Sequence, residues 1–126
     1  MQTAAPKRIL IIDDDPAILK GLEMLLTAAG YQVESSTHGE ETYARIDSFK
    51  PDLVILDVML IGLDGRDICR NIKNNKKTQD LPVMMISANS FAEEEMKGHG
   101  ATTFISKPFD MTNLLGQVAH CLKTVS

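Results

Sequence analysis

Acidic, hydroxyl and basic side chains follow the most apolar stretches of this sequence. Asp57 ends the run Leu-Val-Ile-Leu, and Asp13 and Asp14 end the run Ile-Leu-Ile-Ile. Ser87 and Lys107 follow two later apolar runs. Short apolar runs rich in β-branched residues are typical of strands that are buried on both faces. Each of these polar side chains is therefore expected at the exit of a strand.

Three carboxylates gathered in one crevice predict a cation site. At an effective dielectric constant near ~20, each close pair of acids costs on the order of a few kcal/mol. Mg²⁺ suits such a group because it accepts one or two carboxylates together with water and phosphate oxygens. A carboxylate beside Mg²⁺, the Ser87 hydroxyl and the Lys107 ammonium is equipped for phosphoryl transfer. Asp57, which ends the most central run, is the best candidate for the nucleophile.

Alternating strands and helices must position these groups. Apolar runs predict strands at 7–12, 31–36, 51–57, 81–86 and 102–105, with helices after each of them. Asp15 before Pro16 is typical of a helix N-cap. Thr37 with Glu40, and Ser90 with Glu93, predict capping boxes, and Asp110 is expected to cap the last helix. Residues 58–65 are expected to form a loop.

Five strand–helix units predict an α/β fold with a doubly wound, five-stranded parallel sheet. The second and fifth strands are the most polar and so belong at the edges, which the order 2-1-3-4-5 satisfies. This order gives a flavodoxin-like, three-layer α/β/α arrangement, in which ligands bind at the carboxyl ends of the strands. The candidate residues would then share one rim of the sheet.

Composition limits the alternatives. The 126 residues, 44 % of them hydrophobic, fit a single domain with its core at 7–122. The net charge of -4, the dispersed Lys and Arg and the absence of Trp argue against direct nucleic-acid binding. No apolar run approaches the ~18 residues of a membrane span, and no secretory signal begins the chain, so we expect a cytoplasmic protein without membrane contact. Cys69 and Cys121 are expected to be free thiols.

The sequence resembles the receiver domain of two-component response regulators over essentially its whole length. The resemblance is carried by motifs that occur in order: Asp13-Asp14, then Leu53-Val54-Ile55-Leu56-Asp57, then Leu63-Asp64-Gly65, then Ser87-Ala88, then Phe104-Ile105-Ser106-Lys107-Pro108. It resembles in particular stand-alone receivers such as the chemotaxis regulators. Each fragment alone is weak, and their joint occurrence at this spacing is specific.

The resemblance implies a role for each candidate residue in phosphorelay signalling. Asp57 would accept a phosphoryl group from a histidine kinase or a histidine phosphotransfer protein. Mg²⁺ would be held by Asp14, Asp57 and the backbone carbonyl of Met59, with Asp13 acting through water. Ser87 and Lys107 would contact the phosphoryl oxygens.

The family also implies a switch. Movement of Ser87 would accompany inward rotation of Phe104 and remodel a protein-binding face, a population shift biased by new charge. Such a domain is regulatory and not an enzyme, since it catalyses only its own phosphorylation and dephosphorylation. Two positions depart from the family: Ile61 stands where proline is usual, and Phe104 replaces the commoner tyrosine.

Two other functions are consistent with parts of the pattern. A phosphatase like the haloacid dehalogenases would use Asp13 as nucleophile and Asp15 as acid, but Ala17 does not fit its motif. A degenerate receiver would only dock partners. The sequence leaves open the cognate kinase, the downstream target or effector domain, the phosphoryl lifetime and a phosphorylation-dependent homodimer. It also leaves open whether the Lys107-Pro108 bond is cis and whether the domain stands alone or belongs to a longer regulator.

Overall fold

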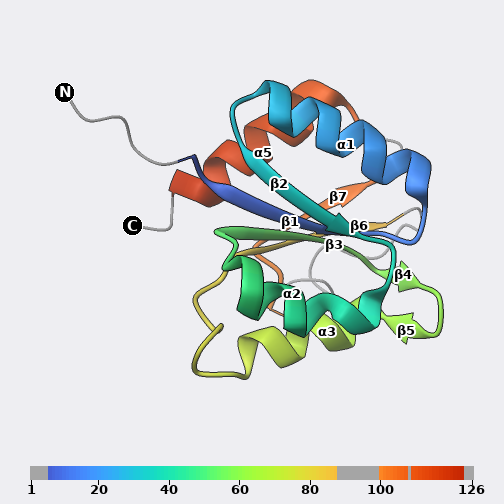
Figure 1. The fold of residues 1–126 in the computed structure, drawn as a ribbon, viewed down its shortest axis with the longest axis vertical. Helices are drawn as coiled ribbons and strands as arrows, with labels where there is room; N and C mark the ends of the chain where they lie inside the picture. The colour runs from blue at the N-terminus through green and yellow to red at the C-terminus, as the bar shows by residue number, and fades with distance from the viewer. Residues whose placement is uncertain (1–5, 88–99, 108, 124–126) are drawn as a thin grey trace.

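The computed structural model describes residues 6–87, 100–107 and 109–123, and its chain forms a parallel sheet between two layers of helices (Figure 1). The sheet contains β1 (Arg8–Ile12), β2 (Gln32–Ser36), β3 (Leu53–Asp57), β6 (Val83–Ser87) and β7 (Thr103–Ser106). The helices among the described residues are α1 (Pro16–Ala28), the 3₁₀ helix η1 (Gly39–Glu41), α2 (Thr42–Phe49), α3 (Gly65–Lys73) and α5 (Met111–Lys123). The predicted Ser90–Glu93 capping box and the bond to Pro108 lie outside the described residues.

The strand order is β2-β1-β3-β6-β7, with every pair parallel, which confirms the predicted topology. β3 and β6 are buried along their whole length, whereas the more polar β2 and β7 form the edges. The register pairs Ile12 with Leu56 and Asp57 with Ile86. The carboxyl ends of the central strands therefore lie side by side.

Each face of the sheet is covered by two described helices (Figure 1). Leucines 19, 22 and 26 of α1 pack with Leu114 and Val118 of α5 on one face. Ile46 and Phe49 of α2 pack with Ile68, Cys69 and Ile72 of α3 on the other. Successive strand residues alternate between these two cores because side chains of a strand point to opposite faces. The helices thereby hold the strand ends in a fixed arrangement.

Two local predictions differ from the structure. The expected loop at 58–65 contains a short antiparallel hairpin, β4 (Met59–Leu60) and β5 (Leu63–Asp64). The predicted Thr37–Glu40 capping box is wrong, because His38 precedes η1 without a side-chain cap and the Ser36 hydroxyl accepts the His38 N–H at 3.0 Å. Ser36 and Thr37 both carry a hydroxyl, and the bond that forms the turn goes to Ser36.

Candidate functional site

The site is built around Asp57, the last residue of β3. Its side chain is buried, with the whole residue only 3 % exposed. The backbone N–H of Met59 donates to its Oδ1 at 3.1 Å. Because β3 lies between β1 and β6, groups that follow those two strands come next to this carboxylate.

Asp13 and Asp14 follow β1 and reach the same place. Asp13 is fully buried, and its Oδ1 accepts the backbone N–H of Asp15 at 2.9 Å. Its own N–H donates to the carbonyl of Ser36 at 3.2 Å. One carboxylate oxygen from each of Asp13, Asp14 and Asp57 lies within 4.8 Å of the others. The structure thus brings together the three predicted acids.

Lys107 enters the same pocket from the end of β7. Its backbone N–H donates to the Ser87 carbonyl at 2.8 Å, which directs the side chain towards the central strands. Its Nζ donates to Asp13 Oδ2 at 2.9 Å and to Asp57 Oδ2 at 3.1 Å. The ammonium therefore bridges two acids that come from different strands. The sequence predicted that these groups share a rim, but not that the lysine pairs with Asp13.

Burial and charge perturb both partners of this bridge. Burial first, and then repulsion from Asp13, raise the pKa of Asp57 to about 6, against the opposing effects of the Met59 N–H and Lys107. Burial lowers the pKa of Lys107, but the bonds and charges of Asp13 and Asp57 outweigh it and raise that pKa overall. A single ammonium does not balance three carboxylates. The donor set, carboxylate oxygens beside a solvent-accessible cleft, therefore fits a hard divalent cation such as Mg²⁺.

Ser87 and Phe104, the two residues assigned to the switch, lie on the neighbouring strands β6 and β7. Ser87 ends β6, directly after the partner of Asp57 in the sheet, and is fully buried. Phe104 in β7 is half-buried and packs against the core on the α2–α3 face. The Met59 carbonyl as a Mg²⁺ ligand stays a prediction. What the structure adds at this residue is the N–H bond to Asp57.

Gly65 positions the site in a way that sequence reasoning did not assign to it. Its N–H donates to the Val58 carbonyl at 2.8 Å, so the start of α3 lies against the exit of β3. A Cβ at this position would lie 2.1 Å from the backbone oxygen of Asp57. Only glycine permits this approach. The available signal was the Asp-Gly pair at the start of a predicted helix.

Two further acids of the sequence serve as helix caps. The Asp15 side chain accepts the Ala17 N–H at 3.0 Å and so caps α1. Asp64 accepts the Arg66 N–H at 2.8 Å and caps α3. The capping role of Asp15 removes the second acid that a phosphatase like the haloacid dehalogenases would need.

Comparison with known proteins identifies the class to which this fold and pocket belong. The response regulator receiver domain family matches residues 9–119, so the chain belongs to the receiver domains of response regulators. Members of this family act in phosphorelay signalling, are regulatory rather than catalytic in general, bind Mg²⁺ at an acidic pocket and interact with histidine kinases.

Individual relatives agree with this assignment. The chain is 37 % identical over 118 residues to the DNA-binding dual master transcriptional regulator RpaA of Synechocystis, covering 92 % of this chain and 49 % of the relative. A CheY-like response regulator receiver domain protein from Methanospirillum hungatei superimposes with a TM-score of 0.87 at 28 % identity, covering 95 % of this chain and 96 % of that one. The signal receiver domain of a histidine kinase from Syntrophus aciditrophicus gives 0.86 at 30 % identity, covering 95 % and 92 %.

The chain spans about half the length of the curated relatives it matches, RpaA and several regulators named MprA among them. RpaA is named as a DNA-binding regulator, so the expected lack of direct nucleic-acid binding does not hold for this full-length relative. Within the described ranges, no helix is both long enough and apolar enough to cross a membrane.

Proposed function

We propose that Asp57 is the phosphoacceptor of this receiver domain. The observation that carries the proposal is the Lys107 ammonium between Asp57 and Asp13, with Asp14 within 4.8 Å of both acids. A carboxylate oxygen of Asp57 attacks the phosphorus atom, forming a P–O bond while the bond to the donor breaks. From a phosphohistidine, the broken bond is P–N, and the imidazole nitrogen keeps the electron pair.

The other residues of the pocket would stabilise the negative charge of the transferred phosphoryl group. Asp14, Asp57 and the Met59 carbonyl would hold Mg²⁺, with Asp13 acting through water. Mg²⁺ held there would offset the negative charge that the phosphoryl oxygens carry throughout the transfer. The Lys107 ammonium is close enough to Asp57 to exchange its hydrogen bond with the carboxylate for one with a phosphoryl oxygen. The buried Ser87 hydroxyl would bind another phosphoryl oxygen and couple the event to Phe104.

The partner that donates the phosphoryl group would be a histidine kinase or a histidine phosphotransfer protein. A cleft of about 370 Å³ opens at Asp14, and its other lining residues are Pro16, Thr37, His38, Gly39, Glu40 and Ile61. Ile61 is 83 % exposed at the tip of the β4–β5 hairpin. An imidazole that enters along this cleft would approach the acids from the solvent side. The phosphorylated domain would act on a downstream protein target or on an effector domain. It would do so as a monomer or as a phosphorylation-dependent homodimer.

Labelling with a small phosphodonor tests the proposal. With acetyl phosphate and Mg²⁺, the wild-type chain should gain one acid-stable, hydroxylamine-labile phosphoryl group, and EDTA should abolish the gain. Asp57→Asn should remain unlabelled, whereas Asp47→Asn, which changes an exposed carboxylate on α2, should label like wild type. Equal labelling of Asp57→Asn and wild type would contradict the assignment. If neither acetyl phosphate nor beryllofluoride with Mg²⁺ has any effect, the domain is a degenerate receiver.

A further inference from the structure

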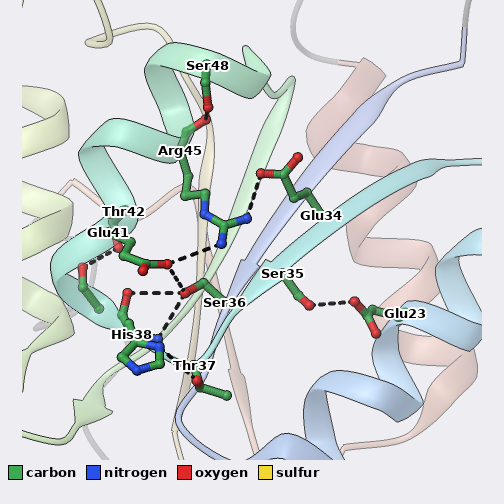
Figure 2. Close-up of polar contacts among 11 residues, drawn as sticks. Glu23, Glu34, Ser35, Ser36, Thr37, His38, Glu41, Thr42, Arg45 and Ser48 are labelled. Atoms are coloured by element: carbon green, nitrogen blue, oxygen red, sulfur yellow. Dashed lines mark hydrogen bonds and ion pairs between the residues drawn. The ribbon is translucent and has the colours of Figure 1, made fainter.

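A polar network joins β2 to the helical segment that follows it (Figure 2). Glu34 and Ser36 lie on the same face of β2, because alternate residues of a strand point the same way. Glu41 and Arg45 lie one helical turn apart on η1 and α2. Arg45 donates from Nη1 to Glu34 Oε1 at 2.8 Å and from Nη2 to Glu41 Oε1 at 3.2 Å. The Ser36 hydroxyl donates to the same Glu41 oxygen at 2.8 Å.

Ser36 is the buried member of this network, with 6 % of the residue exposed. Its Oγ also accepts the backbone N–H of His38 at 3.0 Å, which shapes the turn that leaves β2. The hydrogen bond from Ser36, and then the nearby Arg45, lower the pKa of Glu41. The ionised Glu41 carboxylate is thereby held between a hydroxyl and a guanidinium.

The same turn supports one of the site acids directly. The backbone carbonyl of Ser36 accepts the N–H of Asp13 at 3.2 Å. Asp13 in turn binds Lys107 through its side chain. Thr37 and His38, which follow Ser36, line the cleft that contains Asp14. A change in the turn would therefore reach both acids that follow β1.

The turn also rests on the hairpin next to Asp57. A Cβ added to Gly39 would lie 2.9 Å from a terminal methyl of Leu60 and 2.9 Å from one of Leu63. The loop at 37–39 and the β4–β5 hairpin are thus in close contact. The hairpin begins at Met59, whose N–H binds the Asp57 carboxylate. The turn after β2 consequently bonds to the backbone of Asp13 and packs on the hairpin that follows Asp57, and it lines one cleft with Asp14.

We propose that Ser36, Glu41 and Arg45 are positioning residues that hold the turn after β2 against the acidic pocket and so set the affinity of the pocket for a divalent cation. This inference rests on the proposed function, because the cation is the one that the phosphoacceptor site would use. None of the three residues contacts the cation in this account. They act through the backbone of Ser36 and the packing of Gly39.

Mg²⁺ titration calorimetry of serine variants tests the proposal. Ser36→Ala removes both the bond to Glu41 and the acceptor of the His38 N–H. The dissociation constant for Mg²⁺ should therefore rise about threefold or more, as the loss of hydrogen bonds that hold this turn implies. Ser36→Thr keeps a hydroxyl and should restore the constant to within about twofold. Ser35→Ala is the matched control: its hydroxyl binds Glu23 of α1 on the opposite face of the same strand. It should leave the Mg²⁺ constant unchanged even if urea denaturation shows a loss of stability.

The labelling rate at saturating Mg²⁺ and a second variant complete the test. At saturating Mg²⁺ the labelling rate of Ser36→Ala with acetyl phosphate should approach that of wild type, since only cation affinity is changed. If Ser36→Ala does not fold, Glu41→Gln, at a partly exposed position, should raise the Mg²⁺ constant in the same direction. Unchanged Mg²⁺ constants in these variants, or an equal rise in Ser35→Ala, would overturn the positioning role while the phosphoacceptor assignment stands. A wild-type chain that binds no Mg²⁺ would overturn both.

Discussion

Replacing Asp57 by asparagine should stabilise this protein in the absence of divalent cations. The pKa of the buried Asp57 carboxyl is raised from 3.8 to about 6, so the folded state opposes its ionisation. The sign follows from linkage: for a carboxyl whose pKa is higher when folded, the penalty is absent below pH 3.8, grows as the pH rises and is complete above pH 6. The asparagine side chain would resemble the neutral carboxyl in size and would carry none of this penalty.

The size of the effect follows from the shift. About two pKa units correspond to about 3 kcal/mol of unfolding free energy at pH 7.5, and to only about 1 kcal/mol at pH 4.5. Urea denaturation in EDTA at both pH values measures the difference between Asp57→Asn and wild type. Mg²⁺ should narrow the gap at pH 7.5 because it binds the folded wild-type pocket more tightly than the variant.

Asp47→Asn serves as the control for this measurement. It removes an exposed carboxylate of α2, and its stability should stay within about 0.5 kcal/mol of wild type at both pH values. The electrostatic account is refuted if Asp57→Asn is no more stable than wild type at pH 7.5 in EDTA. It is equally refuted if the stability gap is the same at pH 4.5.

Three other perturbations have defined outcomes. Gly65→Ala places a Cβ 2.1 Å from the backbone oxygen of Asp57, so it should lower the unfolding free energy measured in urea by at least about 2 kcal/mol and abolish labelling. The control Gly21→Ala, which has open space around it in α1, should leave the unfolding free energy unchanged or slightly raised. Lys107→Met removes the ammonium that competes with a cation, so calorimetry should show a Mg²⁺ dissociation constant lower by about fivefold or more. Burial raises the pKa of the Cys69 thiol to about 11 and also raises that of Cys121, so both should resist a thiol reagent in the native protein and react in urea. A Gly65→Ala variant as stable as wild type would contradict the close approach at Gly65. An unchanged Mg²⁺ dissociation constant in Lys107→Met would contradict the competition between Lys107 and the cation, and rapid modification of the native protein would contradict the burial of the two cysteines.

The sheet could be predicted because its central strands carry a strong local signal. β3 and β6 are continuous apolar runs that stop at Asp57 and Ser87, and this pattern needs no knowledge of distant contacts. The edge positions of β2 and β7 followed from their polar residues. The shared rim of acids and lysine was then a consequence of parallel topology.

The features that sequence reasoning missed depend on tertiary contacts. The β4–β5 hairpin pairs only two residues on each side, too few to leave a periodic signal. Ser36 and Thr37 both carry a hydroxyl, and only the folded chain shows that the Ser36 side chain bonds to Glu41 and to the His38 N–H. The pairing of Lys107 with Asp13 joins residues separated by 94 positions, and it appears only when the strand ends meet.

Localising the phosphoryl group tests the central claim most directly. The wild-type chain is incubated with acetyl phosphate and Mg²⁺, the acyl phosphate is reduced with borohydride, and the modified residue is identified by peptide mass spectrometry. We expect modification of Asp57 alone, beside the Lys107 ammonium that lies 3.1 Å from its Oδ2. Modification of Asp13 in place of Asp57 would contradict it.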